Sequence, residues 1–291
     1  MSFPFPTDSR VRAAYAECAR IARAHYENFP VASLFLPRER RPFLTAVYAF
    51  ARGADDIADE GDLPPAERLR LLDQWEARLT SCLSGDADHP VFVALGDTVA
   101  RTGVRPGMLS DLLKAFRMDV TVSSYATFAD LLGYCRYSAN PVGRLVLAVF
   151  GQVTDRLQGL SDNICTALQL TNFWQDLSVD LARGRLYIPL DDCERFGYTK
   201  HDLQARTVGD SFQALMALQI GRTRAMFEAG RPLLREVGPE LRFELELTWR
   251  GGTGVLDLIE RHDYDVIKIR RTLSLADKVK ILTGAALRSR R

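Results

Sequence analysis

The chain has 291 residues, of which 47% are hydrophobic and 26% are charged, and this composition is typical of a globular protein. Lysine and arginine total 38 against 37 aspartate and glutamate residues, so no overall basic field favours a nucleic-acid partner, and we expect none. The odd number of cysteines, without a CxxC pair, favours a reduced cytoplasmic setting over a disulfide framework, and four scattered histidines without an HExxH motif speak against zinc.

The N-terminal segment, MSFPFPTDSR, lacks a basic region followed by an apolar core, so we expect no signal peptide. The longest apolar stretch lies near Leu145–Phe150, far short of the roughly 20 residues that a membrane-spanning helix needs. We therefore expect a cytoplasmic protein, with peripheral contact at the inner face of the membrane as an open alternative.

Apolar residues recur at helical spacing along nearly the whole chain, and no clear alternating runs of β-branched residues predict strands. Phe43, Val47 and Phe50 form one such stripe. Residues that break helices separate the helical stretches at Pro64-Pro65, Gly85 to Pro90, Pro106-Gly107, Pro141, Gly184 to Pro189 and Pro232. The simplest prediction is one all-α domain covering residues 1–291, with a long surface connection from Tyr187 to Val208.

The first acidic stripe lies in the predicted helix YAFARGADDIADE, residues 48–60. Asp55 and Asp59 are four residues apart and share one helix face, where two like charges destabilise an isolated helix but form a ligand pair for a hard cation. Arg52 precedes Asp55 by one turn, and arginine suits bidentate contact with phosphate. A solvated acidic helix end is the alternative interpretation.

The second acidic stripe lies in QLTNFWQDLSVD, residues 169–180, where Asn172, Asp176 and Asp180 repeat every four residues. The apolar positions between them predict a largely buried helix: Phe173, Trp174, Leu177 and Val179. Because a buried carboxylate pair without a cation would be costly, this stripe favours a cation site over a merely exposed face.

The two stripes are more informative together. We expect them to face each other across a cavity, where Mg²⁺ ions would bridge them and hold a diphosphate. The metal would stabilise the charge that grows on the leaving group as a C–O bond breaks.

These stripes and their flanking residues resemble the squalene/phytoene synthase family. The matching blocks are AVYAFARGADDIADEGD (46–62), LLGYCRYSANPVGRLV (131–146), ALQLTNFWQDLSVDLARGRLYIP (167–189) and PLDDCERFGYTKHDL (189–203). They extend over nearly the whole chain, and two acidic motifs in the correct order, followed by RGRLYIP, form a specific signal.

The resemblance implies an all-α isoprenoid synthase fold around a central cavity. It implies Mg²⁺ as cofactor, and the matching metal ligands are Asp55 and Asp59 in the first motif and Asn172, Asp176 and Asp180 in the second. Positions that contact diphosphate in the family correspond to Ser33, Tyr48, Arg52, Gln169, Arg185 and Arg270. The neighbouring Arg271 leaves the register of Arg270 open. Tyr134 matches a cavity tyrosine near the reacting carbons, with plain core packing as the alternative.

One position indicates a branch of the family. Many relatives that condense two prenyl diphosphates carry an arginine directly before the first aspartate of the second motif, whereas this chain has the neutral Gln175 before Asp176. The segment ASLFLPRERRP (32–42) is also similar to the hydroxysqualene synthase branch of the bacterial hopanoid route. This resemblance implies Mg²⁺-dependent conversion of presqualene diphosphate to hydroxysqualene, with water capturing the carbocation. Gln175 is a substrate-binding candidate that alters diphosphate binding or makes room for a polar contact.

Aromatic faces can stabilise a carbocation without attacking it. The candidates for this role are Phe50, Tyr134, Tyr137 and Phe173. The surrounding apolar lining would exclude bulk water and admit one molecule to quench the cation.

Three rival interpretations stay open at this level. The first is a condensing synthase that makes presqualene diphosphate, squalene or phytoene from two prenyl diphosphates. The second is a non-catalytic family member, against which the two intact acidic motifs argue. The third is a helical scaffold with accidental acidic stripes.

An isoprenoid diphosphate is the expected partner, and the assigned reaction implies pathway partners that supply presqualene diphosphate and reduce the product to squalene. The C-terminal segment Lys278–Arg291 mixes apolar and basic residues. It could dock on an anionic bilayer, and a solvated helix end is the equal alternative.

Overall fold

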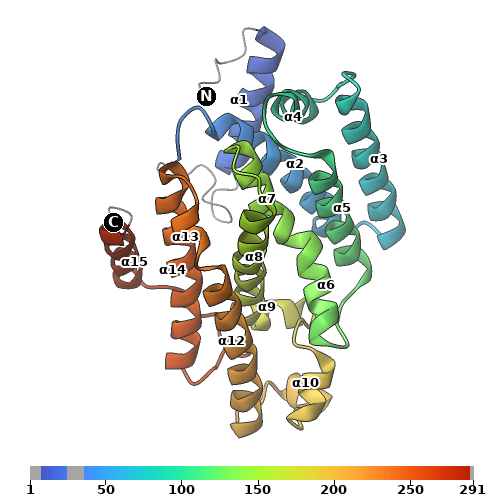
Figure 1. The fold of residues 1–291 in the computed structure, drawn as a ribbon. Coiled ribbons are helices and arrows are strands. Elements are labelled where there is room, and N and C mark those ends of the chain that lie inside the picture. The colour runs from blue at the N-terminus through green and yellow to red at the C-terminus, as the bar shows by residue number, and fades with distance from the viewer. Residues whose placement is uncertain (1–7, 25–35, 289–291) are drawn as a thin grey trace. The chain divides into compact units, whose positions relative to one another are not determined.

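The computed structural model describes residues 8–24 and 36–288. Within these ranges the chain forms fifteen helices and no β-strand, so the prediction of an all-α protein is confirmed (Figure 1). A single isolated bridge pairs Ser124 with Leu186. None of the described helices is both long and apolar enough to cross a bilayer.

By their internal contacts, residues Met1–Thr121 and Pro141–Gln158 form one compact unit, and residues Val122–Asn140 and Gly159–Arg291 form another. The first unit contains α1 Ser9–Ala24, α2 Arg41–Asp59, α3 Pro65–Leu83, α4 Pro90–Arg101, α5 Pro106–Thr121 and nearly all of α7 Asn140–Val149. The second contains α6 Phe128–Ser138, most of α8 Asp155–Gln175, α9 Leu177–Ala182, α10 Leu190–Arg195, α11 Lys200–Ala205, α12 Asp210–Gly230, α13 Leu233–Glu236, α14 Pro239–Arg261 and α15 Leu275–Arg288. A single domain over the whole chain stays a prediction.

Prolines mark helix starts, as the pattern of breakers predicts. Helices α3, α4 and α5 begin at Pro65, Pro90 and Pro106. Proline lacks a backbone N–H and has a fixed φ, and the first turn of a helix tolerates both because its N–H groups have no intrahelical partner. Local chemistry therefore sets these boundaries.

In the first unit, α2 packs against α1, α3, α4 and α5. Its core side includes Phe50, which is fully buried and packs on the rings of Trp75 and Phe92. Trp75 Nε1 donates to the Phe50 carbonyl at 3.2 Å, and Gly53 leaves room for the indole, because a Cβ there would lie 2.5 Å from Trp75. This packing fixes the rotation of α2 and leaves the acidic side of the helix away from the core.

In the second unit, small residues allow α8, α12 and α14 to approach closely. A Cβ on Gly230 would lie 2.8 Å from the Leu160 carbonyl, and one on Gly252 would lie 2.4 Å from the Phe227 ring. Trp174 of α8 is fully buried, and its Nε1 donates to Thr223 Oγ1 of α12 at 2.8 Å. These contacts fix the helix that carries the second acidic stripe.

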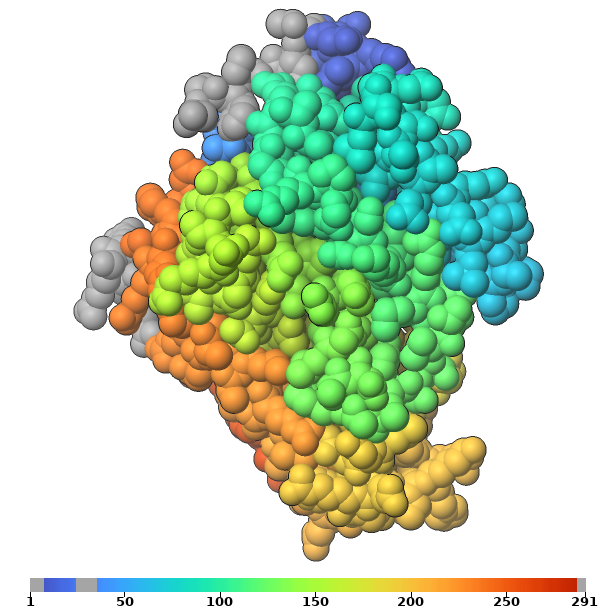
Figure 2. Space-filling model, turned by 45° about the vertical axis from the view of Figure 1, so that its right-hand side comes forward, coloured from blue at the N-terminus to red at the C-terminus, as the bar shows by residue number. Residues whose placement is uncertain are grey.

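Most side chains from Tyr187 to Val208 are exposed or half-buried, as expected for a surface connection, but the segment also forms two short helices and buries a few side chains. It contains α10 and α11, Ile188 is fully buried, and Asp192 is 4% exposed. Asp192 pairs with Arg222 of α12, with atoms at 2.5 and 3.1 Å, and accepts from Gln219 at 2.9 Å. In Figure 2 the segment is yellow and lies beside a green part of the second unit. Leu190 N–H donates to the carbonyl of Tyr125, just before α6.

Candidate active site

The first acidic stripe forms the last turns of α2. Asp55 and Asp59 lie one helical turn apart, and the helix ends at Asp59. Ala54 and Ala58 take the buried positions of these turns, whereas Asp55 is half-buried and Asp59 is exposed. The spacing predicted from the sequence is therefore present, on a helix end that solvent can reach.

Arg52 is the counterion of this stripe. Its guanidinium lies 3.1 Å from Asp55 Oδ2 and also pairs with Asp56 and Glu60. Burial acts to lower the pKa of Arg52, but the three neighbouring carboxylates outweigh it and the pKa is raised. Arg52 thus stays charged within the acidic stripe, and its contact with a diphosphate stays a prediction.

Asp55 lies in a surplus of negative charge. The pKa of Asp55 is raised, and burial is the largest cause. Arg52 acts to lower this pKa, whereas the charges of Asp59, Asp56 and Glu60 raise it further. The contact with Arg52 therefore does not offset the effects of burial and of the neighbouring carboxylates on the pKa of Asp55. A bound divalent cation would relieve the same repulsion, and oxygen donors are the ligands that Mg²⁺ takes.

Replacing Asp55 with asparagine should raise the stability of the metal-free protein at neutral pH. A carboxyl with a raised pKa binds its proton more tightly in the folded state, so stability falls as pH rises from the unfolded pKa, about 3.9, toward the folded value. The variant lacks this penalty, so its thermal midpoint should exceed that of the wild type at pH 7, and the gain should vanish below about pH 4.

Differential scanning calorimetry in EDTA across pH measures this gain. Asp62→Asn removes the same charge from an exposed position just beyond α2 and is the control, with a midpoint close to the wild type. A lower midpoint for Asp55→Asn at pH 7 would show that its contact with Arg52 outweighs the repulsion.

Tyr48 lies one turn before Arg52 and is half-buried. Burial raises the pKa of its hydroxyl, Arg52 acts to lower it, and Asp55 and Asp56 raise it further. Tyr48 therefore shares the electrostatic environment of the stripe. The remaining predicted contact from the N-terminal third, Ser33, lies outside the described residues.

Sequence reasoning missed Arg68 of α3, which orders the chain after the first stripe. Its guanidinium donates to the carbonyls of Ile57 at 2.9 Å, Glu60 at 3.1 Å, Gly61 at 2.6 Å and Leu63 at 3.0 Å. A cation at a helix C-terminus satisfies free carbonyls and interacts favourably with the helix dipole. No local pattern in the sequence marks this arginine, because its partners are backbone atoms.

The second stripe lies on two helices rather than one. Helix α8 ends at Gln175 and α9 begins at Leu177, with Asp176 between them at φ −97° and ψ 10°. Asp176 N–H still donates to the Asn172 carbonyl at 2.8 Å, and Asp180 N–H donates to the Asp176 carbonyl at 2.9 Å. The expectation of a continuous helix is wrong at one residue, and the one-turn spacing of the three side chains is kept.

The burial pattern of this stripe is close to the expected one. Phe173, Trp174 and Leu177 are buried, whereas Val179, expected to be buried, is 37% exposed. Asn172 is exposed, and Asp176 is half-buried. The stripe therefore lies at the edge of the core, where its oxygens remain accessible.

Arg270 contacts the second stripe, and its role in binding diphosphate stays a prediction. Arg270 Nε and Nη2 pair with the two carboxylate oxygens of Asp176, the second at 3.3 Å, whereas Arg271 lies 3.8 Å from Asp265. The bond to Asp176 is the first cause that raises the pKa of Arg270. Gln175 Nε2 donates to the Arg271 carbonyl at 2.5 Å, so this side chain holds the same segment against the end of α8.

Arg185 follows α9 in a fixed turn. Gly184 adopts φ 76°, its N–H donates to the Leu181 carbonyl, and Arg185 N–H donates to the Asp180 carbonyl at 2.9 Å. This pattern is a Schellman motif, which ends a helix through a glycine with positive φ. It sets Arg185 directly beyond the second stripe. Gln169, the other predicted contact on this segment, is half-buried on α8.

Aromatic rings gather beside the second stripe. Phe173 and Tyr187 stack with centroids 3.7 Å apart and planes at 8°, and Tyr134 lies 6.0 Å from Phe173 and 5.7 Å from Tyr125. The predicted candidates Tyr134 and Phe173 are thus neighbours, and they are joined by Tyr125 and Tyr187, which were not among the candidates predicted from the sequence. The RGRLYIP block contains Tyr187 and gave the available signal.

Phe50 and Tyr137 are the other two aromatic candidates from the sequence. Phe50 is fully buried in the core of the first unit between Trp75 and Phe92, so its structural role is packing. Tyr137 is half-buried on α6.

The donor chemistry of the two stripes fits a hard cation. All five predicted ligands carry carboxylate or amide oxygens, which suit Mg²⁺ better than zinc or a soft metal. Among residues 8–24 and 36–288, no three histidine, cysteine, aspartate or glutamate side chains already form a group that could hold a metal ion. In the described structure, Arg52 and Arg270 instead serve as cationic partners of the stripes.

Comparison with known proteins gives one family. Residues 9–277 match the model of the family described as Squalene/phytoene synthase. A hydroxysqualene synthase from Rhodopseudomonas palustris is 38% identical over 76% of this chain and 75% of its own length. Phytoene synthase 3, chloroplastic, from Zea mays is 32% identical over 98% of this chain and 68% of its own length.

A solved structure extends the likeness to the fold. The crystal structure of squalene synthase HpnC from Alicyclobacillus acidocaldarius is 43% identical, with a TM-score of 0.84, and covers 89% of this chain and 97% of that one. The all-α arrangement found here is therefore the fold of that synthase.

Proposed function

This chain belongs to the squalene/phytoene synthase family of prenyl synthases, and from that premise we propose that it converts presqualene diphosphate to hydroxysqualene. The reaction loses diphosphate and captures the resulting carbocation with water. The proposal rests on sequence identity. This chain shares more identical residues with the hydroxysqualene synthase (38%) and with squalene synthase HpnC (43%) than with the maize phytoene synthase (32%).

Mg²⁺, when bound, would stabilise the negative charge that grows on the departing diphosphate. In the proposal, Asp55 and Asp59 hold it at the first motif, and Asn172, Asp176 and Asp180 hold it at the second. Their i, i+4 spacing on helix ends supports this assignment, as does the negative surplus around Asp55.

Cationic and polar side chains would bind the diphosphate oxygens. Arginine can make bidentate contacts with phosphate and stays charged at every relevant pH. The proposed set is Ser33, Tyr48, Arg52, Gln169, Gln175, Arg185 and Arg270. Arg52 and Arg270 already pair with carboxylates of the two motifs, so each guanidinium can exchange a carboxylate partner for a phosphate oxygen when a diphosphate binds.

The rings beside the second motif would stabilise the carbocation. Tyr134, Phe173, Tyr187 and Tyr125 form a cluster whose faces carry negative quadrupole charge. We propose that Tyr134 lies nearest the reacting carbons. The water that quenches the cation would enter a site from which bulk water is excluded.

A condensing synthase is the second candidate. Phytoene synthases match almost the full length of this chain, and this observation favours an enzyme that joins two prenyl diphosphates. The neutral Gln175, where many condensing relatives carry arginine, favours the first proposal.

Product analysis separates the two. Purified protein with Mg²⁺ and presqualene diphosphate, without a nicotinamide, should give hydroxysqualene and inorganic diphosphate. A parallel reaction with farnesyl diphosphate alone should leave the substrate intact. Untouched presqualene diphosphate, together with consumption of farnesyl diphosphate, would reject the proposal in favour of the condensing synthase.

The proposed reaction sets the expected surroundings of the enzyme. A presqualene diphosphate synthase would supply its substrate, and a reductase would convert its product to squalene. We propose a cytoplasmic protein that contacts the inner face of the membrane peripherally, since substrate and product are largely hydrocarbon.

A further inference from the structure

Helix α15 exposes a stripe of large apolar side chains. Leu275 is 79% exposed, Val279 is 50% exposed and Leu282 is 41% exposed. Positions i, i+4 and i+7 lie on one face of a helix, so the three side chains form a continuous strip along α15. Ile269, before the helix, is 54% exposed.

The strip is unusual within this protein. Four of the eight large hydrophobic side chains that the described residues leave exposed lie between positions 269 and 282. Single exposed apolar side chains are ordinary on a protein surface, whereas a contiguous apolar patch marks an interaction site. The strip is therefore a candidate interaction surface.

The opposite face of α15 is held against α14, which fixes the rotation of the helix. Ala285 is fully buried, and Gly284 lies against Arg250, because a Cβ there would come within 2.9 Å of its guanidinium. Asp277 caps the helix by accepting from Ser274 and lies 3.6 Å from Arg261. The apolar strip thus faces away from α14 in a defined orientation.

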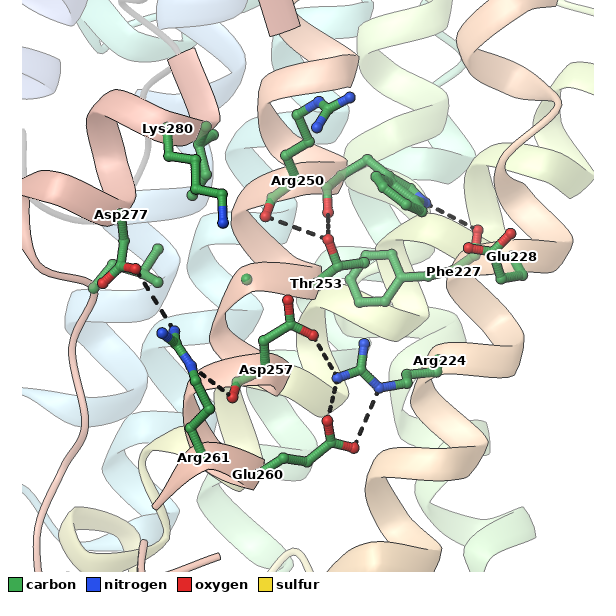
Figure 3. A pocket seen from close by; sticks show the side chains of 14 residues that line it. Arg224, Phe227, Glu228, Arg250, Thr253, Asp257, Glu260, Arg261, Asp277 and Lys280 are labelled. Carbon is green, nitrogen blue, oxygen red and sulfur yellow. Dashed lines mark hydrogen bonds and ion pairs between the residues drawn. The ribbon is translucent and has the colours of Figure 1, made fainter. Parts of the chain in front are cut away.

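A cavity of about 710 Å³ separates parts of α15 from α12 and α14, as Figure 3 shows. Arg224 pairs with Asp257 and Glu260 inside it, and Arg261 pairs with Asp277. Lys280 of α15 also lines the cavity (Figure 3). Helix α15 is therefore a peripheral element whose outer face is left for another contact.

The charge beside the strip is positive. Lys278 is exposed next to the strip on α15, whereas Lys280 lines the cavity on the inner side (Figure 3), and the single acidic residue of the helix, Asp277, pairs with Arg261. The sequence continues with Arg288, Arg290 and Arg291. An amphipathic helix with an apolar face, a flanking lysine and a basic continuation of the chain has the composition of a helix that lies in the interface of an anionic membrane.

We propose that the exposed strip of Leu275, Val279 and Leu282 docks α15 on an anionic lipid bilayer. The strip enters the boundary between headgroups and acyl chains, and Lys278 contacts anionic headgroups. This proposal names the surface that would make the membrane contact of the proposed function, and its biological purpose rests on that function. Binding itself requires no catalysis, so its test is independent of the reaction.

The test is flotation of the full-length protein with phosphatidylcholine vesicles, with and without phosphatidylglycerol. We expect the wild type to float with anionic vesicles, to float less with neutral ones, and to be released by high salt, because salt screens the lysines. The triple variant Leu275→Ser/Val279→Ser/Leu282→Ser should bind at least roughly tenfold more weakly. The inner face of α15 is unchanged in this variant, so circular dichroism should show wild-type helix content.

The matched control is Leu63→Ser/Leu83→Ser, which removes two exposed leucines of 41% and 39% exposure from the first unit. It should float like the wild type. Equal flotation of the triple variant and the wild type, or no flotation of the wild type, overturns the proposal. So does a wild-type dimer that the triple variant dissociates in light scattering, without any change in flotation, because the strip would then bind a second copy.

The same preparations separate this proposal from the proposed reaction. The triple variant should keep wild-type turnover of detergent-dispersed substrate, since α15 contributes none of the proposed active-site residues. Loss of flotation with retained turnover supports docking, and absence of hydroxysqualene from every preparation rejects the reaction alone.

Discussion

Replacing Asp176 with asparagine should lower turnover at least about 100-fold, because one ligand charge of the second motif is lost and metal ligands contribute several kcal/mol to charge stabilisation. The fold should remain intact, since Asp176 is half-buried at a turn and its backbone hydrogen bonds do not involve the carboxylate. Steady-state rates of diphosphate release at increasing Mg²⁺ measure the effect. The Mg²⁺ concentration that gives half-maximal activity should rise as well.

Asp86→Asn is the control for this variant. It removes the same charge from an exposed position after α3, and its turnover should equal that of the wild type. Wild-type activity of Asp176→Asn at limiting Mg²⁺ would contradict the assignment of the second motif. Loss of activity without any change in Mg²⁺ dependence would instead indicate the broken pair with Arg270.

Replacing Arg222 with methionine should destabilise the protein by about 3–5 kcal/mol, because removal of one partner leaves a buried charge uncompensated. Asp192 is 4% exposed, and its two oxygens face the Arg222 guanidinium, with Gln219 as the remaining described donor. Methionine keeps much of the side-chain volume and its contact with Phe128, over which Arg222 lies at 4.5 Å. Urea unfolding monitored by circular dichroism measures the loss.

Arg224→Met is the matched control, two residues along the same helix. Arg224 pairs with Asp257 and Glu260, which are 59% and 38% exposed, so water solvates these carboxylates after the change. Arg224→Met should lower the free energy of unfolding by only about 0–1 kcal/mol, the range of exposed ion pairs. Equal destabilisation by the two variants would refute the claim that the burial of Asp192 makes the loss of its partner costly.

The candidate site was predictable where its pattern is local. The spacing of Asp55 and Asp59 on one helix follows from their positions in the sequence, and the structure keeps it. The turn at Asp176 was not predictable, because the hydrogen bonds on both sides of it are those of a helix. Resemblance to a family supplied the residues that periodicity does not mark, including Tyr48 and Arg270.

Local sequence patterns could not predict the long-range contacts of Arg270, Arg222 and Arg68. Arg270 reaches Asp176 over 94 positions in the sequence, and Arg222 reaches Asp192 over 30. Arg68 bonds to carbonyl groups, which every residue carries. Nothing in the sequence near these arginines distinguishes them from the many that remain on the surface.

The sequence by itself determined the all-α class, the helix starts at proline and the two acidic stripes, because helical periodicity and proline geometry act over a few residues. Only the tertiary structure decided that Asp192 is buried, that Arg270 rather than Arg271 contacts the second stripe, and that Leu275 and Leu282 of α15 are exposed. Burial and ion pairing depend on which distant segments meet, and that information is distributed over the whole chain. The action of both stripes on one diphosphate stays a prediction, for the same physical reason.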